Sequence, residues 1–172
     1  MLRKPRLEDA QDLLEYVGDP DVMRWIGGAT GDLAATVATI ERWLARWEEN
    51  DIGHFSVVHE GHVIGRVGFL VWDADGWNVS SYAEALEPVT ELGWTIARKY
   101  WGHGYATEAA QALRTWAYDE VRIERLISLI DPNNHRSIRV AEKLSAQPDE
   151  TVAVDGNPIV VWVHPHGQLP AR

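Results

Sequence analysis

The amino-acid sequence predicts a mixed α/β fold, an α+β arrangement in which one mixed sheet of about seven strands is covered by about four helices. Segments with apolar residues at every third or fourth position, as on one helical face, alternate with segments rich in Val, Ile and aromatic residues, as in strands. Their order is β-α-α-β-β-β-α-β-α-β-β. This order indicates antiparallel hairpins at both ends of the chain and one parallel crossover between them.

Four segments carry the helical periodicity. They cover 7–17, a stretch from a cap in 30–32 to about residue 50, 105–121 and 134–144. The second helix places Trp43 and Trp47 four residues apart and therefore on one face. These two side chains are interpreted either as core packing or as an aromatic wall over a bound substrate.

The strand-like segments predict the sheet and the position of a ligand site. They cover 2–3, 55–58, 63–72, 89–97, 126–130, 151–154 and 159–163. The polar segment 73–87 is longer than a simple connection needs to be, which indicates a functional or oligomeric role. A ligand site is expected at the carboxyl end of the crossover strand, just before Trp101.

Length, charge and composition narrow the class of protein. With 172 residues, the chain is expected to form one domain over residues 1–165 and a flexible tail over 166–172. Sixteen basic residues against 26 acidic ones give a net charge of −10, which disfavours nucleic acid as a partner and favours solubility or a cationic substrate. The absence of cysteine excludes a cysteine nucleophile and disulfides. No signal peptide or membrane span is recognised, so we expect a cytoplasmic protein without a membrane partner, and the sequence is compatible with a homodimer.

The segment Trp101–Thr107 lies between a predicted strand and a predicted helix and contains Gly102 and Gly104. Because glycine has no side chain, successive backbone N–H groups can point inward there and bind an anion. The following helix adds the positive end of its dipole, so the segment is predicted to bind a diphosphate. It lacks the Gly-Lys-Ser/Thr sequence of a Walker loop and the third glycine of the dinucleotide fingerprint, so neither of those sites is predicted.

Three separated motifs extend this interpretation. They are Leu92–Ala97 (LGWTIA), Tyr100–Ala109 (YWGHGYATEA) and Asp131–Leu144 (DPNNHRSIRVAEKL). In this order they resemble the motifs of the GNAT N-acetyltransferases, specifically the branch similar to ribosomal-protein-alanine acetyltransferases. Residues 2–23 resemble the same branch, so the likeness covers nearly the whole chain and implies a GNAT-like fold.

The resemblance implies that acetyl-CoA is the co-substrate. The pyrophosphate-binding pattern of the family falls on Trp101, Gly104 and Ala106, and the pantetheine arm is implied to pair with the crossover strand like an extra strand. The residues implied to bind acetyl-CoA are Trp94, Thr95, Ile96, Gly102, His103, Gly104, Tyr105, Ala106, Thr107 and Asn134. Asn134 is also expected to cap the helix that it opens. No His-Glu-x-x-His pair is present, so no metal site is predicted.

The implied reaction is direct attack of a neutral amine on the thioester, which requires a base and a proton donor. Glu91, just before the residues implied to pair with the cofactor, is the predicted base. A salt-bridged surface carboxylate is the alternative interpretation of Glu91. Many relatives carry a tyrosine acid where this chain has Ala141, so Ser137 is the predicted substitute donor. Ser145-Ala146 also departs from the Gly-Phe that is usual in this branch.

The acceptor stays open between two amines. The branch implies a protein amino terminus, whereas the net charge and the acidic residues Asp73, Asp75, Glu84 and Glu87 favour a small polyamine or aminoglycoside-like amine. A solvated acidic face is the structural alternative for those carboxylates. A further alternative, suggested by Ala141, is a non-catalytic sensor that binds acyl-CoA without turning it over.

Overall fold

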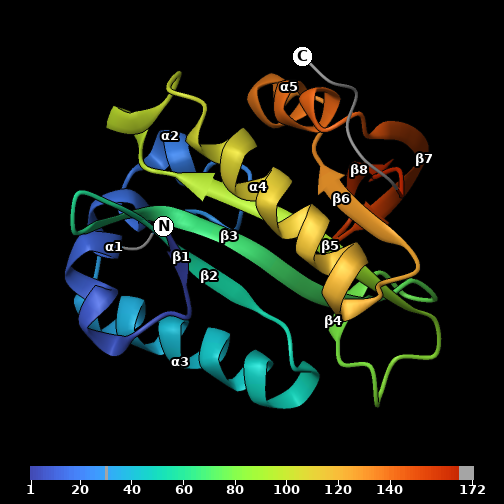
Figure 1. Cartoon of the computed structure of the whole chain (residues 1–172), viewed down its shortest axis with the longest axis horizontal. Coiled ribbons are helices and arrows are strands. Elements are labelled where there is room, and N and C mark those ends of the chain that lie inside the picture. Colours follow the sequence, from blue (N-terminus) through green and yellow to red (C-terminus); the bar gives the residue numbers. More distant parts are fainter. Residues whose placement is uncertain (30, 167–172) are drawn as a thin grey trace. The chain divides into compact units, whose positions relative to one another are not determined.

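Eight strands and five α-helices make up the fold in the computed structural model, which describes residues 1–29 and 31–166 (Figure 1). The strand order in the sheet is β1-β2-β3-β5-β6-β8-β7, and β4 pairs with β3. The β5–β6 pair is parallel, and the pairs β1–β2, β2–β3, β3–β4, β6–β8 and β7–β8 are antiparallel. The predicted mixed α/β class and its single parallel crossover are therefore confirmed.

The elements have the following bounds. The strands are β1 (Leu2–Arg3), β2 (His54–His59), β3 (His62–Asp73), β4 (Asn78–Ser80), β5 (Pro88–Ile96), β6 (Leu126–Ile130), β7 (Gln147–Val154) and β8 (Asn157–Val163). The α-helices are α1 (Ala10–Val17), α2 (Pro20–Met23), α3 (Leu33–Asn50), α4 (Tyr105–Trp116) and α5 (His135–Lys143).

Two short elements escaped the sequence prediction. The helix α2 spans four residues, too few for a periodicity, but Asp19 caps it by accepting the Asp21 N–H, and Pro20 opens it. The strand β4 lies inside the segment 73–87 that was expected to be a loop. It forms because β3 extends to Asp73 and offers an edge with which three residues can pair.

The ends of two predicted helices also differ in type. The first begins as a 3₁₀ turn at Leu7–Asp9, and the predicted 105–121 helix becomes a π-helical turn at Ala117–Val121. The predicted tail, 166–172, lies outside the described residues except for His166, whose ring centroid is 4.7 Å from that of Tyr118.

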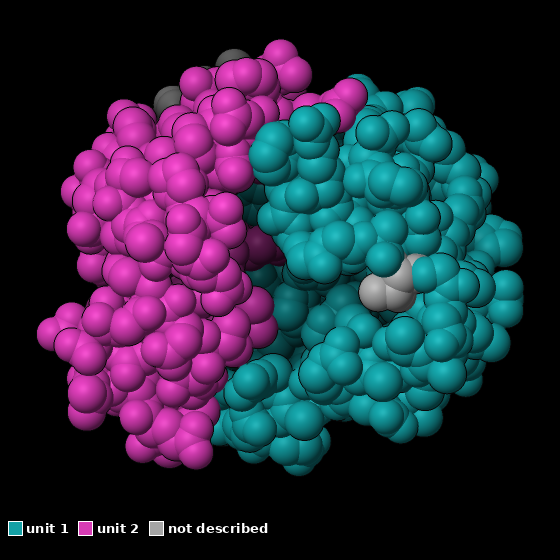
Figure 2. Space-filling model, turned by 180° about the vertical axis from the view of Figure 1, so that it is seen from behind, with its two compact units in different colours: residues 1–68, 94–109 teal, residues 69–93, 110–172 magenta. Residues whose placement is uncertain are grey.

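The chain divides into two compact units, residues 1–68 with 94–109 and residues 69–93 with 110–172 (Figure 2). The strands β3 and β5 and the helix α4 each contribute residues to both units. The expectation of a single domain over residues 1–165 stays a prediction.

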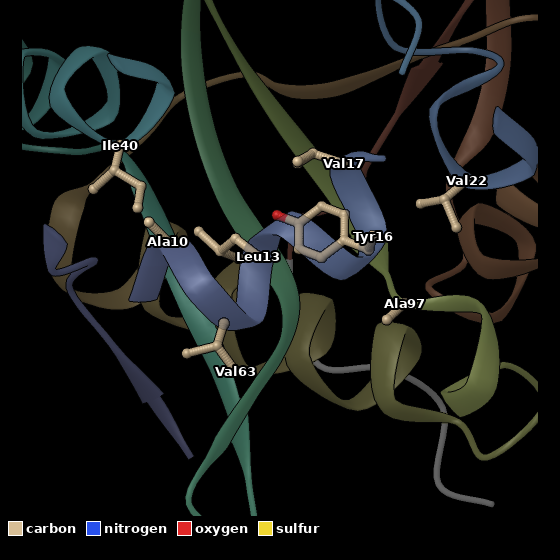
Figure 3. Packing of buried hydrophobic residues seen from close by; sticks show 8 residues of the cluster. All are labelled: Ala10, Leu13, Tyr16, Val17, Val22, Ile40, Val63 and Ala97. Carbon is tan, nitrogen blue, oxygen red and sulfur yellow. The ribbon is translucent and has the colours of Figure 1, made fainter. Parts of the chain in front are cut away.

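The core of the first unit joins its two longer helices to the sheet. Figure 3 shows its buried members, which are Ala10, Leu13, Tyr16, Val17, Val22, Ile40, Val63 and Ala97. They come from α1, α2, α3, β3 and the end of β5. Side chains at three- and four-residue spacing on α1 face this core, which is why that helix was predictable from its pattern.

The second unit is built around β5, β6 and β8. Val89, Ile127 and Val161 form its buried cluster. Phe69 on β3 packs against Trp116 on α4 with ring centroids 5.8 Å apart. Ser145 follows α5 with φ of 60°, and the Ala146 N–H donates to the Ala141 carbonyl at 3.0 Å, so a serine occupies a left-handed position of the kind that favours glycine.

Candidate functional site

The turn before α4 has the backbone conformation expected of an anion cradle. Gly102 and Gly104 have φ of 84° and 87°, which favours glycine, and a Cβ built at either position would meet nothing within 4 Å. The first helical hydrogen bond runs from the Glu108 N–H to the Gly104 carbonyl at 3.0 Å. The N–H groups of Tyr105, Ala106 and Thr107 therefore precede the hydrogen-bonded part of the helix. A ligand can approach this backbone without meeting a side chain from the glycines.

The strand that leads to this turn is anchored at its end. The Trp101 indole Nε1 donates to the Ile96 carbonyl at 2.7 Å, and the Ala97 N–H donates to the Ile64 carbonyl at 2.8 Å. Gly65 lies so close to β5 that a Cβ there would be 2.2 Å from the Thr95 carbonyl oxygen. Thr95 is buried, and its hydroxyl has no hydrogen-bond partner among the described residues. These contacts bring the predicted residues Thr95, Ile96 and Trp101 together.

Aromatic rings surround the turn, and one of them was not foreseen. Tyr105 donates to or accepts from His59 at 3.1 Å (Oη to Nε2), and its ring is stacked on His103 with centroids 5.9 Å apart. Tyr100 packs edge-on against both His59 and Tyr105. The sequence pattern singled out His103 and Tyr105 but missed His59, because His59 lies at the end of β2, 46 residues earlier than Tyr105.

The predicted base, Glu91, lies on β5 and is half-buried. Its Oε2 accepts a hydrogen bond from the Trp72 indole Nε1 at 2.6 Å. A donor on the neighbouring strand β3 therefore holds one oxygen of this carboxylate. No sequence motif singled out Trp72, since this contact depends on which strands the fold places side by side.

The parallel ladder between β5 and β6 is short in the second unit. Its register pairs are Thr90–Leu126 and Glu91–Ile127. At the next position, the buried Ser128 hydroxyl donates to the Leu92 carbonyl at 2.6 Å, so a side chain takes the place of a backbone donor. We conclude that Ser128 marks the point where β5 and β6 stop pairing.

Ser128 is itself held by a buried histidine. The Ser128 Oγ is 2.8 Å from His164 Nε2, and because the hydroxyl proton goes to Leu92, the ring nitrogen must be the donor. The neutral imidazole therefore carries its proton on Nε2. Burial, reinforced by the positive charge of Arg114, lowers the pKa of His164 to about 3.

The residues predicted at the start of α5 lie half-buried in the second unit. The Asn134 Oδ1 accepts the Ser137 N–H at 3.2 Å, which is the capping geometry expected for a helix-opening asparagine. The Ser137 hydroxyl makes no hydrogen bond to the described residues. Ala141, which replaces the usual tyrosine, is fully buried.

The acidic segment after β3 is braced by its own first carboxylate. Asp73 accepts the N–H groups of Asp75, Leu86 and Glu87 at 3.0–3.2 Å. These hydrogen bonds lower the pKa of Asp73. The Asp73 carboxylate therefore joins the two ends of the segment 73–87 through hydrogen bonds.

The two tryptophans of α3 have different surroundings. Trp47 is buried, its indole donates to the His54 carbonyl at 2.8 Å, and Lys4 Nζ lies 4.1 Å from its ring centroid. Trp43 is half-buried and stacks on the His54 ring with centroids 5.1 Å apart. Trp47 thus packs in the core, and Trp43 alone of this pair has the partial exposure that a substrate-facing indole needs.

Comparison with known proteins decides the family. Residues 1–147 match the model of the acetyltransferase (GNAT) domain. The chain belongs to the GNAT family. It is 30% identical to the YkkB protein of Bacillus subtilis (strain 168) over 84% of this chain and 78% of that one, and 28% identical to the N-acetyltransferase p20 of Bacillus licheniformis over 86% and 79%.

The structure is also similar to that of a GNAT enzyme with its ligands. The aminoglycoside acetyltransferase AAC(6')-Ib, solved with paromomycin and acetyl-CoA, superposes with a TM-score of 0.77 at 22% identity over 96% of this chain and 93% of that chain. At this identity the likeness concerns the fold. This GNAT chain is an acetyltransferase, and its predicted enzyme class is confirmed by the family.

The cradle fits the diphosphate of an acyl-CoA on its own geometry. The two open glycines leave room for a ligand, and the first turn of α4 presents N–H groups toward its amino-terminal side. Among residues 1–29 and 31–166, no group of three or more His, Asp or Glu side chains is arranged to hold a metal ion. No described helix is long and apolar enough to cross a membrane.

Replacing Gly104 with valine is expected to weaken acetyl-CoA binding at least tenfold, because the side chain would fill the open approach to the backbone and strain a left-handed φ. Calorimetric titration of the folded variant with acetyl-CoA measures this change. The matched control is Gly156→Val in the β7–β8 turn, where φ is 77° and the Cβ space is equally open. Equal affinities for both variants would remove the turn from the cofactor site.

The buried His164 predicts an acid-sensitive fold. Its ring is neutral in the folded state down to about pH 3, whereas the unfolded ring gains a proton near pH 6.5. Stability from this group is therefore complete above pH 6.5 and decreases as the pH falls toward 3. Between pH 7.5 and 5 the loss should be about 2 kcal/mol, and burial lowers the pKa of His54 in the same direction.

Urea unfolding of parent and His164→Gln at pH 7.5 and 5 checks this. The variant should lose about 2 kcal/mol less than the parent over this interval. The exposed His135→Gln serves as the control and should behave like the parent. If the parent and His164→Gln lost the same free energy of unfolding between pH 7.5 and 5, the low pKa of His164 would be contradicted.

Proposed function

We propose that this GNAT acetyltransferase uses acetyl-CoA and transfers the acetyl group directly to the primary amine of a small molecule. The observation that carries the proposal is the pair of open, positive-φ glycines immediately before α4, in a chain of this family. A diphosphate is the ligand that such a backbone suits best. The motifs resemble those of the ribosomal-protein-alanine acetyltransferase branch, but the proposal does not assign the chain to that branch.

The proposed cofactor contacts use backbone more than side chains. The pyrophosphate would be held by N–H groups of 102–107, and the pantetheine arm would pair with Trp94–Ile96 near the end of β5. Asn134 would contribute its side-chain amide, whose oxygen already caps α5. Acetyl-CoA would supply an activated acetyl thioester there, and the chain's own residues would orient the amine and move its proton.

Glu91 is the proposed general base. An ammonium group must lose its proton before it can attack, and the free pKa is about 10.4 for a lysine side chain and about 8 for an α-amine. The Trp72 indole holds Oε2 of this carboxylate at 2.6 Å and so fixes its orientation on β5. Glu91 and the proposed cofactor-pairing residue Trp94 both belong to β5 and are three residues apart in the sequence.

Ser137 is the proposed donor to the leaving thiolate. Its hydroxyl makes no hydrogen bond to the described residues, so the donor is not committed elsewhere in the helix. Ala141 cannot serve because it has no polar atom. We expect a modest contribution from Ser137, since water can also protonate a thiolate.

The small-molecule acceptor is supported by two observations. The relative AAC(6')-Ib was solved with the small polyamine sugar paromomycin, in a fold with a TM-score of 0.77 to this one. The second is the half-buried Trp43 on α3, whose indole is partly exposed although His54 stacks on it. A protein amino terminus is the alternative acceptor that the motif likeness favours, and amino-terminal peptides therefore have to be tested beside small amines.

Turnover should appear as amine-dependent release of the coenzyme A thiol. Because the chain contains no cysteine, a thiol reagent reports only the released coenzyme A. A panel of small amines and amino-terminal peptides, each with acetyl-CoA, should contain small amines that raise thiol release far above hydrolysis. Binding of acetyl-CoA without release for any amine would favour the sensor, and release with peptides alone would favour the protein acceptor.

Glu91→Gln should lower kcat about 100-fold at neutral pH and recover partly at high pH, where the amine loses its proton without help. Glutamine keeps an oxygen that can accept the Trp72 hydrogen bond, so the fold should persist. Glu84→Gln, in the exposed part of the acidic segment, is the control for removal of one carboxylate. A parental pH profile in Glu91→Gln would exclude Glu91 as the base.

A further inference from the structure

Arg66 on β3 is a half-buried cation without a counter-ion. Its guanidinium carbon lies 5.6 Å from the centroid of the Trp43 ring, and it forms no hydrogen bond or ion pair with residues 1–29 or 31–166. A partly desolvated guanidinium without a carboxylate is energetically unfavourable. The Arg66 guanidinium therefore has hydrogen-bond donors that no described residue accepts.

The buried carboxylate of Asp9, in the 3₁₀ turn before α1, is engaged by other donors. Asp9 accepts hydrogen bonds from both terminal nitrogens of Arg3 at 2.6 and 2.8 Å, from the Ser56 hydroxyl at 2.7 Å and from the Arg6 N–H at 3.0 Å. Ser56 is the cross-strand partner of Arg66. The Asp9 carboxylate, which is bonded to the cross-strand partner of Arg66, is thus already saturated by other donors.

Two further polar groups near Arg66 lack partners. The Tyr16 hydroxyl and the His54 Nδ1 are buried and form no hydrogen bond with any described residue, although the two side chains are only 1% and 2% exposed. The charge of Arg66 acts on both groups, since it opposes the burial-induced rise in the pKa of Tyr16 and adds to the lowering of the pKa of His54. Figure 3 shows the Tyr16 hydroxyl pointing away from Val22 and Ala97.

The aromatic ring of Trp43 links these groups in space. It stacks on His54 with centroids 5.1 Å apart and has Arg66 over its ring. Tyr16 belongs to the core cluster against which Trp43 packs. The Trp43 indole therefore has the Arg66 guanidinium over its ring and the His54 imidazole stacked on it.

This group adjoins the segment proposed to pair with the cofactor. Gly65 precedes Arg66 and approaches the Thr95 backbone so closely that no side chain would fit between them. Ala97, which follows β5, packs in the same cluster as Tyr16. A molecule held at Arg66 would thus lie in the unit that contains Thr95 and Ile96.

We propose that Arg66 binds a carboxylate of the acceptor, so that the substrate is a small amine that also carries a carboxylate. The inference rests on the proposed acetyl transfer for the amine part alone. Arginine presents its donors in a fork that matches the two oxygens of a carboxylate.

The proposal differs from the cationic acceptor expected from the net charge. The protein's own guanidinium occupies the face of Trp43 that an ammonium would need, and Asp73 is engaged in bracing its loop. An extended cation at this place would be repelled by Arg66. The local charge, rather than the net charge of the chain, decides the preference.

Paired substrates test the proposal on the intact chain. Acetylation of tyrosine, ornithine and phenylalanine is compared with acetylation of tyramine, 1,4-diaminobutane and 2-phenylethylamine, each pair differing by one carboxylate. The parent should have a KM about tenfold to a hundredfold lower for the carboxylate-bearing member of at least one pair. Arg66→Met should abolish this ratio, Arg66→Lys should retain part of it, and Arg42→Gln, an exposed arginine on α3, should keep it.

A binding measurement separates this inference from the proposed chemistry. Calorimetric titration of the parent with 3-phenylpropionate, which has the carboxylate but no amine, should show binding that Arg66→Met weakens by the same factor. Acetylation without any carboxylate preference would overturn the carboxylate site and leave the proposed function standing. Carboxylate binding without acetylation of any amine would overturn the proposed function and support the site. If the parent shows neither a carboxylate preference in acetylation nor binding of 3-phenylpropionate, the proposal is wrong.

Discussion

The hydrogen bond from the Ser128 hydroxyl to the Leu92 carbonyl determines where two parallel strands stop pairing. Backbone ladders continue as long as each carbonyl meets an N–H, and here a side-chain donor takes that place after two register pairs. The donor is held by His164, which must stay neutral to remain buried. β5 continues from Leu92 to Trp94–Ile96, the segment that we propose to pair with the pantetheine arm of acetyl-CoA.

The features proposed for function stand on rigid elements. Glu91 lies within β5 and is held by Trp72 on β3, and the cradle is the turn that leads into α4. Even the long acidic segment is closed by three hydrogen bonds to Asp73. A catalytic group fixed in this way loses little entropy when the substrate binds, which is the main advantage of preorganisation.

Both units bury polar side-chain atoms without a hydrogen-bond partner among the described residues, and the Tyr16 hydroxyl and His54 Nδ1 belong to the first unit. Buried hydroxyl and imidazole groups left without hydrogen bonds cost about 1–3 kcal/mol each, and Tyr16 and His54 both fall in that class. The buried Asp9 carboxylate of the same unit, in contrast, accepts four hydrogen bonds. Such a contrast within one unit is typical of a place where stability has been given up for binding.

Local rules determined much of this protein from its sequence alone. The strands and longer helices follow from periodicity, Asn134 caps α5 because capping involves only neighbouring residues, and the positive φ of Gly102 and Gly104 follows from the turn before a helix. The family also followed from three motifs, and the match over residues 1–147 confirmed it. The short β4 and α2 were missed because neither is long enough to carry a pattern.

Only the tertiary structure decided the roles that depend on distant residues. Trp47 became a core side chain because His54 offers it a carbonyl, and His164 was placed beside Ser128, 36 residues earlier. Arg66 was left without a counter-ion because Arg3 and Ser56 had taken Asp9. A sequence pattern records which residues are near in the chain, whereas desolvation and hydrogen-bond saturation depend on which residues the fold brings together.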